Sequence, residues 1–178
     1  YIEDKGQEAQ LEVFHHYRFR WFDRSSIEAE VEQRRAKPFL VNQKNAEVCG
    51  MAVIMYVLAK RKYSEYKKFV LELHQKGVSE VGDYKVNVSD SIHLLGMNPT
   101  TNSLYPSLKS SKMPYCDWIP FSLIRDEENF WKDYDGGPGS TITAATSAGE
   151  IKSIMEDFGF QNVTDETTLF WIKDINHN

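Results

Sequence analysis

The chain has 178 residues, of which 41% are hydrophobic and 26% are charged, and its formal net charge is −5. The length predicts one domain, or one domain with a small appendage, and the acidic balance argues against a nucleic-acid protein that works through a general basic field. No apolar run in the sequence approaches the roughly 18 residues of a membrane span, and no signal peptide is recognisable. We therefore expect a globular chain with neither a membrane span nor a nucleic-acid partner.

Only two cysteines, Cys49 and Cys116, occur in the sequence. Two unpaired thiols in a reducing compartment are the simplest interpretation, and a single bridge between them is the alternative. Cys116 lies in "PYCDWIP", which has no C-x-x-C partner and no nearby histidine, so no zinc site is expected there. Because the first residue is Tyr1 and not Met, we expect a processed or trimmed chain.

The first forty residues predict an arm followed by a helix. In "LEVFHHYRFRWF", residues 11–22, alternate positions are apolar or aromatic, which indicates a strand or an extended arm. Residues 25–37 are rich in helix formers, with Ser26 as the expected N-cap and Pro38 as the stop. We accordingly divide the chain into an N-terminal arm and helix, 1–40, and a main domain, 41–178.

Two consecutive helices are predicted in the first half of the main domain. One runs from Cys49 to about Lys62 and is apolar nearly all round at its start, so it should be buried. The second begins near Ser64, has apolar residues at three- and four-residue spacing, and should end at Gly77 in the C′ position.

The middle of the sequence predicts a strand and then irregular structure. "DYKVNV", residues 83–88, indicates a short strand, and residues 89–96 indicate a capped helical turn. Residues 97–120 contain four prolines and are expected to be loop. A short helix is expected over 126–134, and its acidic start should be solvated. The glycine-rich stretch 135–141 lacks the lysine of a phosphate-binding loop and is expected to be a turn.

The last forty residues predict one helix followed by strands. Ser147 and Glu150 form an S-x-x-E capping box, and the helix they begin should end at Gly159. "FQNV" and "TLFWIKDI", residues 160–163 and 168–175, indicate strands. Helices that come first, followed by short strands and a late helix, favour an α+β fold over repeated βαβ units.

The most informative stretch is "VNQKNAEVCGMAVIMYVLAKR", residues 41–61. A thiol at the start of a helix becomes a better nucleophile because the unpaired N–H groups and the helix dipole lower its pKa. Gln43, six residues before Cys49, can place its amide beside the thiolate. Together with the backbone N–H of Cys49, that amide can donate hydrogen bonds to a developing oxyanion. The alternative is that Cys49 is one more small buried hydrophobe.

Q-x5-C-G followed by an apolar helix resembles the papain-like cysteine peptidases, especially divergent bacterial branches such as double-glycine leader peptidases and effector or toxin peptidases. The resemblance covers residues 41–62 closely. It implies that Cys49 is the nucleophile and that Gln43 supplies the oxyanion hole. It also implies a papain-like α+β fold in which a central buried helix starts at the cysteine and packs on a small antiparallel sheet.

A peptidase of this kind also needs a histidine as base and a residue that orients it. His177 lies 128 positions after Cys49, close to the family spacing of about 130–150 residues. Asn178 follows it and is the candidate orienting residue. In the family the histidine begins a hairpin or barrel, so we expect the fold to be incomplete at its C-terminus. The alternatives for the base are His15 and His16, because circularly permuted relatives carry the histidine strand before the cysteine helix.

The two other histidines are expected to have structural roles. His74, near the end of the second helix, is expected to interact with the helix dipole, and His93, beside two leucines, is expected to pack.

The resemblance implies a thiol hydrolase that acts on a peptide or protein substrate without a metal or cofactor. A bacterial toxin or effector of this kind would be cytoplasmic in the producing cell, would reach its target without a signal peptide, and would need an inhibitory or immunity protein or a covering domain. The alternative function is a non-catalytic interaction module, in which Cys49 is core and the aromatic-rich loops form the partner surface.

Overall fold

The structure, a computed structural model, describes residues 3–4, 7–8, 17–42, 49–88, 97–98, 103–104, 113–128 and 148–164. These residues form five α-helices, one 3₁₀ helix and six short strands. The helices are α1 (Arg24–Ala36), η1 (Pro38–Leu40), α2 (Cys49–Arg61), α3 (Tyr63–Lys76), α5 (Tyr115–Glu128) and α6 (Ala148–Asp157). The strands are β1 (Glu3–Asp4), β2 (Gln7–Glu8), β3 (Val78–Val81), β4 (Tyr84–Asn87), β5 (Met97–Asn98) and β6 (Ser103–Leu104).

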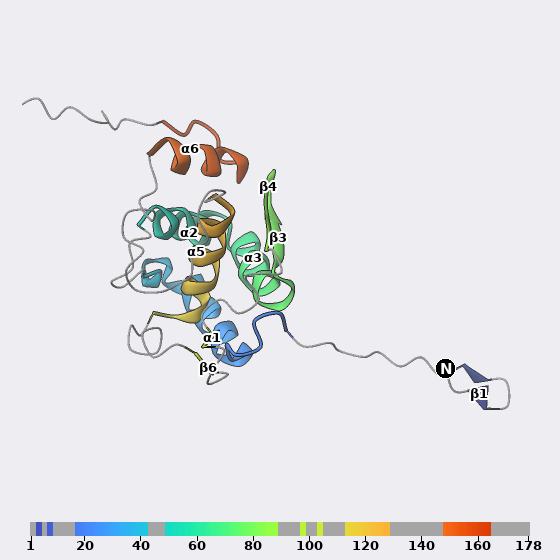
Figure 1. Cartoon of the computed structure of the whole chain (residues 1–178). Helices are drawn as coiled ribbons and strands as arrows, with labels where there is room; N and C mark the ends of the chain where they lie inside the picture. The colour runs from blue at the N-terminus through green and yellow to red at the C-terminus, as the bar shows by residue number, and fades with distance from the viewer. Residues whose placement is uncertain are drawn as a thin grey trace, which may run out of the picture.

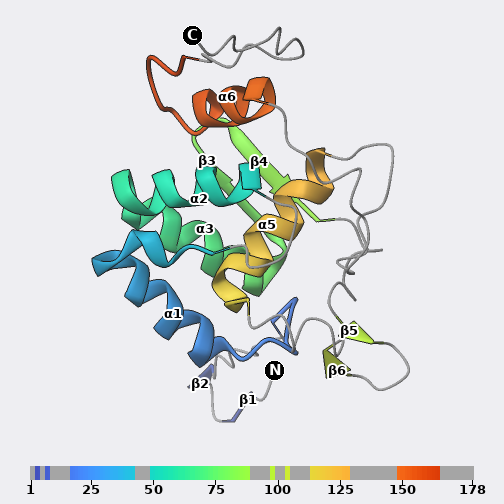
Figure 2. The ribbon, with the colours of Figure 1, turned by 90° about the vertical axis from the view of Figure 1, so that its left-hand side faces the viewer.

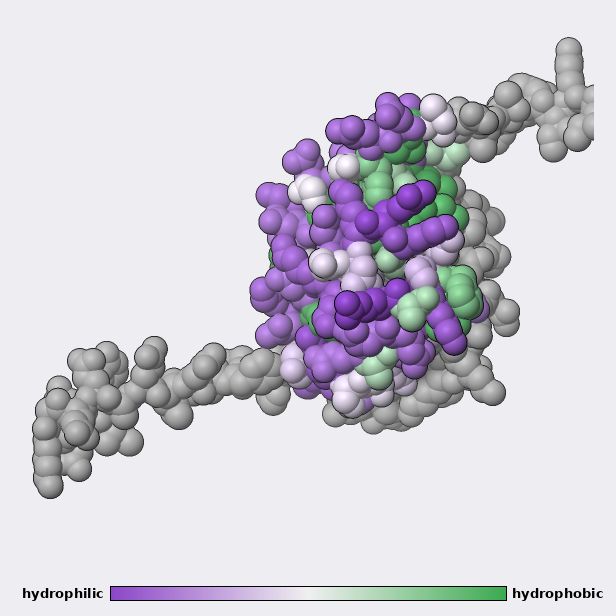
Figure 3. All heavy atoms as spheres, turned by 180° about the vertical axis from the view of Figure 1, so that it is seen from behind, coloured by the Kyte–Doolittle hydropathy of each residue, from purple (hydrophilic) through white to green (hydrophobic). Residues whose placement is uncertain are grey.

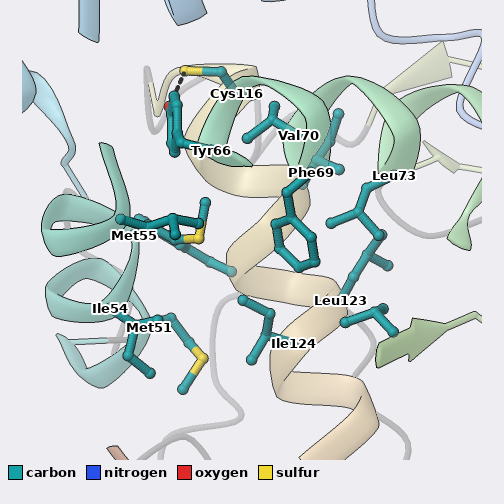
Figure 4. Packing of buried hydrophobic residues seen from close by; sticks show 14 of the residues in the cluster. Met51, Ile54, Met55, Tyr66, Phe69, Val70, Leu73, Cys116, Leu123 and Ile124 are labelled. Atoms are coloured by element: carbon teal, nitrogen blue, oxygen red, sulfur yellow. Dashed lines mark hydrogen bonds between the residues drawn. The ribbon is translucent and has the colours of Figure 1, made fainter. Parts of the chain in front are cut away.

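Four helices, α1, α2, α3 and α5, pack against one another and enclose the core (Figure 1). Helix α6 lies at one end of this group against α2, and the β3–β4 hairpin lies beside α3 and α5 (Figure 2). Buried side chains from α2, α3 and α5 interdigitate, among them Met55, Phe69 and Ile124, each 0% exposed (Figure 4). Burial of each such large apolar side chain contributes about 1.5–3 kcal/mol to the free energy of unfolding. This cluster is therefore the main source of stability in the described part of the chain.

The strands form three separate two-stranded antiparallel sheets. The longest is the β3–β4 hairpin, in which Val81 pairs with Tyr84 across the turn. Its side chains alternate between buried and exposed, so one face packs on the core and the other meets solvent. The general prediction of a mixed α+β fold is thus confirmed for the described residues. The strand predicted over 83–88 is confirmed as β4, whereas β3 was not predicted.

Helices α2 and α3 follow the predicted boundaries closely. α2 begins at Cys49 and ends at Arg61, and α3 ends where Gly77 adopts the left-handed conformation with φ 71°. The Gly77 N–H donates to the Leu73 carbonyl, which satisfies one of the free carbonyls at the end of α3. The apolar run was therefore sufficient to predict α2, and the apolar spacing with the C′ glycine was sufficient to predict α3.

The N-cap of α1 lies three residues before the predicted one. The N-cap is Asp23 and not Ser26, because the Asp23 carboxylate accepts from the Ser26 backbone N–H at 2.7 Å. The side-chain hydroxyls of Ser25 and Ser26 also donate to it. These hydrogen bonds stabilise the charged carboxylate and lower the pKa of Asp23 to about 2.

The strand predicted over 11–22 is wrong in its described part, because residues 17–22 form turns. The backbone N–H groups of Arg18 and Phe19 donate to the carbonyls of Gln75 and His74 at the end of α3. The segment therefore satisfies a helix C-terminus and pairs with no described strand. Phe19 and Phe22 are both buried at three-residue spacing, so the aromatic alternation seen in the sequence does not correspond to the two faces of a strand.

The position of helix α5 shows that two predictions were wrong. Residues 115–120 were expected to be loop, yet α5 begins at Tyr115 and contains Pro120. The helix predicted over 126–134 starts eleven residues too late, and residues 129–134 lie outside the described ranges. A proline inside a helix removes one backbone hydrogen bond, but the residues around it are almost all buried, and their packing outweighs this loss.

Helix α6 is confirmed, and Gly159 after it has φ 75°, whereas residues 160–163 contain no strand. The turn of the hairpin meets the end of α6, where the Asp83 N–H donates to the Asp157 carbonyl at 2.8 Å. Gly82 in that turn has φ 58° and lies so close that a Cβ would stand 2.3 Å from the Asp157 carbonyl oxygen. The contact therefore requires glycine at position 82.

The described surface is mainly hydrophilic on the face opposite to that of Figure 1, with smaller hydrophobic areas between the polar residues (Figure 3). The large hydrophobic residues most exposed among those described are Phe39, Val53 and Val78. None of the described helices is both long and apolar enough to cross a membrane. The expected turns and strand at 89–96, 135–141 and 168–175 lie outside the described residues.

Candidate functional site

The candidate nucleophile stands at the first residue of the central helix. α2 begins at Cys49, and no acidic residue occurs in its first turn. Gly50 is buried and Met51 is 0% exposed, so the helix enters the core within one turn of the cysteine. The free N–H groups and the dipole of a 13-residue helix favour a negative charge at this position. The structure thus places the backbone of Cys49 at the start of a helix, the position at which helices in general favour a thiolate.

Cys49 is the only predicted catalytic residue that the structure places. Gln43, His177 and Asn178 lie outside the described ranges, and so do the alternative bases His15 and His16. His93, which was predicted to pack, also lies outside the described ranges. Their roles thus stay predictions from the sequence.

The second thiol, Cys116 on α5, is deep in the core and 0% exposed. Its Sγ accepts from the Tyr66 hydroxyl at 3.8 Å (Figure 4) and donates to Asp117 Oδ1 at 3.6 Å. Burial, followed by the nearby Asp117 charge, raises the pKa of Cys116 well above its ordinary value. Cys116 is therefore a neutral, inaccessible thiol in the folded protein.

A buried ion pair lies next to this thiol. The Arg34 Nη2 of α1 donates to Asp117 Oδ2 at 2.6 Å, and the two side chains are only 2% and 1% exposed. Burial raises the pKa of Asp117 to about 6, against the opposing effect of the Arg34 charge. For Arg34, burial disfavours the charge, but the charge and hydrogen bond of Asp117, together with nearby Cys116 and Tyr66, outweigh this and raise the pKa. The pair is therefore charged at neutral pH and depends on both partners.

The same pair holds the chain that leads toward Cys49. Arg34 Nη2 also donates to the Leu40 carbonyl at 3.1 Å, and Asp117 Oδ2 accepts from the Asn42 backbone N–H at 3.1 Å. η1 packs against α2 as well as α1. Leu40 and Asn42, at the end of the described range 17–42, are thus held by the Arg34 guanidinium and the Asp117 carboxylate.

His74 does not have the predicted role at the end of α3. The side chain is 0% exposed and stacks at 4.8 Å on the Tyr17 ring. Nε2 lies 3.0 Å from the Phe22 carbonyl and Nδ1 lies 3.3 Å from Arg24 Nη1, so Nε2 carries the proton and Nδ1 accepts. Burial, together with the Arg24 charge, lowers the pKa of His74. The His74 ring is therefore buried and bonded to Phe22 and Arg24, where an interaction with the helix dipole was expected.

The lowered pKa of His74 predicts a pH-dependent stability. The unfolded chain takes up the proton near pH ~6.5, whereas the folded chain does so only at lower pH, so the contribution of His74 is present above pH ~6.5 and lost as the pH falls. We expect wild type to lose more stability between about pH 7.5 and pH 5 than His74→Gln, in urea titrations of both. Equal losses in the two proteins would contradict this assignment.

A groove of about 330 Å³ lies between α3 and the hairpin. Four of its charged side chains pair with one another, Lys76 with Glu72 at 3.2 Å and Lys85 with Glu80 at 3.8 Å, and Lys68 also lines it. Neither a cysteine nor a histidine is among its described lining residues. No group of three or more His, Cys, Asp or Glu side chains in the described ranges could hold a metal ion. The groove therefore adds neither a thiol nor an imidazole to the candidate site.

A scan against protein-family models, a search of curated proteins and a search of solved structures each find no match to this chain. The likeness to papain-like peptidases accordingly rests on the motif in residues 41–62.

Proposed function

We propose that this chain is a thiol hydrolase of the papain-like kind that cleaves peptide or amide bonds, with Cys49 as its nucleophile. The observation that supports the proposal is the position of Cys49, which is the first residue of α2, a mainly apolar helix that packs against α3 and α5. A second observation decides which of the two cysteines is the candidate nucleophile. The sequence has two cysteines, and Cys116 is buried and neutral, so Cys49 remains the candidate.

In the proposed reaction the Cys49 thiolate attacks the carbonyl carbon of the scissile bond. The backbone N–H of Cys49 and the side-chain amide of Gln43 donate to the oxyanion of the tetrahedral intermediate. His177, oriented by Asn178, gives a proton to the leaving amine, and the acyl group stays on sulfur. Water, deprotonated by the same imidazole, then releases the acid and regenerates the thiol.

An activated ester tests this chemistry because it needs little substrate recognition. With p-nitrophenyl acetate, we expect nitrophenolate to be released and an acetyl group to be transferred to Cys49. Intact-mass spectrometry and peptide mapping detect the acetyl group and locate it. Cys49→Ala should abolish both signals, and Cys116→Ala should retain them. Gln43→Ala should slow the acylation step by about 10²–10³-fold, the usual cost of losing one oxyanion donor.

The histidine variants distinguish the candidate bases. His177→Ala should leave an acetyl group on Cys49 that is not turned over, whereas His15→Ala and His16→Ala should turn over normally. Release of nitrophenolate that does not depend on Cys49 would contradict the hydrolase proposal. It would favour the alternative, a non-catalytic interaction module in which Cys49 is core.

The biological setting in the proposal is a bacterial effector or toxin domain that acts on a peptide or protein. An active thiol hydrolase threatens the cell that makes it, so the proposal includes an inhibitory or immunity protein or a covering domain. Cytoplasmic synthesis and delivery to a target cell belong to the same proposal.

A further inference from the structure

The β3–β4 hairpin is a two-stranded sheet of its own, so β3 has one edge that no described strand covers. The hairpin lies beside α3 at the side of the helix group (Figure 1). The groove of about 330 Å³ between α3 and the hairpin is lined by three consecutive residues of β3, Val78, Ser79 and Glu80. A free strand and a groove beside it therefore occur at the same place on the described surface.

The register of the hairpin shows which backbone groups of β3 point away from β4. The Val88 N–H donates to the Gly77 carbonyl at 3.0 Å, and hydrogen-bonded and non-hydrogen-bonded pairs alternate along an antiparallel ladder. Val78, opposite Asn87, is therefore in a non-hydrogen-bonded pair, and so is Glu80 two residues further on. Their N–H and C=O groups point out of the sheet, and none of the described residues is hydrogen-bonded to them there.

The two edges of the hairpin differ in how they are held. On β4, the outward N–H of Asn87 donates to the Glu127 carboxylate of α5 at 3.3 Å. β3 is fixed through its buried face, where Ser79 Oγ donates to Glu72 Oε2 of α3 at 2.9 Å. The hairpin turn is hydrogen-bonded to the end of α6 as well. The β3 edge is thus unpaired but fixed in position, so a strand that adds to it need not order it first.

The charges of the groove favour an acidic occupant. Lys68, Glu72 and Lys76 follow one another at four-residue spacing on α3, so their side chains share one wall of the groove. Lys76 pairs with Glu72, and Lys85 pairs with Glu80. Lys68 has no ion-pair partner in the described part of the chain. The groove therefore carries one positive charge that is not neutralised within it.

A second copy of the chain fits this edge less well than a single extended segment does. The β3 strand of a second copy is flanked by its own α3, so pairing of the two edges would bring the Lys68 side chains of both copies to one junction. Like charges in that position repel each other. An isolated extended segment brings neither a second helix nor a second set of lysines.

We propose that β3 is a docking edge for an extended acidic segment of a partner protein, which adds to the hairpin as a third strand. The backbone of the segment pairs with the outward N–H and C=O groups of Val78 and Glu80, and one of its acidic side chains reaches Lys68. The Val78 side chain, 44% exposed, offers an apolar contact on the same strand. This inference goes beyond the proposed hydrolase activity and does not depend on Cys49.

The test is an NMR titration of the isotope-labelled chain with two capped heptapeptides, STVDVTS and STVKVTS. We expect the aspartate peptide to shift the amide signals of Val78 and Glu80 and to slow their exchange with solvent, because both N–H groups gain an acceptor. The lysine peptide should bind about fivefold more weakly, the size of effect expected for one exposed ion pair.

Reversing the charge at Lys68 should reverse this preference. Lys68→Glu should bind the aspartate peptide about fivefold more weakly than wild type does and the lysine peptide more tightly. Its unfolding temperature should stay the same, because Lys68 is exposed. Lys60→Glu is the matched control, since it makes the same change of net charge on α2, outside the groove. Equal losses in the two variants would mean general charge attraction and would overturn the inference.

Methylation of the peptide nitrogens tests the backbone pairing. Alternate N–H groups of an added strand face β3, so of two aspartate peptides methylated at alternate sets of nitrogens, one should lose binding and the other should keep it. Equal affinities of these two peptides, or no shift at Val78 and Glu80 with the unmethylated aspartate peptide at millimolar concentration, would overturn the docking edge. Shifts at the same amides that grow with protein concentration alone, with a dimer in sedimentation, would assign the edge to a second copy and overturn it too.

Discussion

Asp117→Ala is expected to lower the free energy of unfolding by about 3–5 kcal/mol, the usual cost of leaving one member of a buried ion pair without its partner. Arg34 is 2% exposed, so its guanidinium cannot regain water without opening the junction of α1 and α5. The substitution also removes the acceptor of the Asn42 N–H. Urea titration of the variant, followed by circular dichroism, measures the loss.

The control for this prediction is the double variant Arg34→Met with Asp117→Leu, which replaces the buried ion pair by apolar side chains of similar size. It should be much more stable than Asp117→Ala. The comparison separates the cost of an unpaired buried charge from the cost of changed packing. A loss below about 1 kcal/mol for Asp117→Ala would mean that the pair is solvated in the folded protein and would contradict the buried arrangement.

Gly82→Ala should destabilise the chain by about 3 kcal/mol, because it combines backbone strain with a steric clash. Gly82 has φ 58°, and the added Cβ would lie 2.3 Å from the Asp157 carbonyl oxygen and 3.1 Å from the Phe158 carbonyl carbon. Both are backbone atoms at the end of α6, so no side chain can move aside. The hairpin turn and α6 must separate, and the hydrogen bond from Asp83 to Asp157 breaks with them.

Gly159→Ala is the matched control for this second prediction. Gly159 also has a positive φ, 75°, but its added Cβ would meet only Lys62 Nζ at 3.1 Å, and a lysine side chain can move. It should therefore show the backbone strain alone, about 1 kcal/mol. Thermal unfolding of the two variants compares them directly. Equal losses would contradict a tight contact between the hairpin turn and α6.

The helices with strong local signals were predicted from the sequence. α2, α3 and α6 have apolar residues at helical spacing, and Gly77 and Gly159 mark the chain just beyond two of their ends. Such signals lie within a few residues of one another. Local sequence therefore carried enough information for these elements.

Helix α5 could not be predicted in the same way. Pro120 is a strong local signal against a helix, and the packing that overrides it comes from α1, α2 and α3, which are distant in sequence. The prediction for the arm before α1 was wrong for a related reason. Aromatic alternation over 17–22 indicated a strand, but these residues bind the end of α3, and that partner is not visible in a local pattern.

The Arg34–Asp117 pair was also missed, although part of its signal is in the sequence. Arg34 follows Ile27 and Val31 at helical spacing, which puts it on the apolar face of α1. A basic residue on an apolar face predicts a buried acidic partner. Asp117 is 83 positions further along the chain, so no local pattern identifies it as that partner.

The most direct test of the central claim is the pH dependence of iodoacetamide alkylation at the two cysteines of the native protein. A thiolate at the start of α2 should make Cys49 react with a midpoint well below pH ~8.5, the value of a free thiol. Cys116 should stay unlabelled until the protein is unfolded. Alkylation of Cys49 only at the ordinary thiol midpoint, or only after denaturation, would contradict the account.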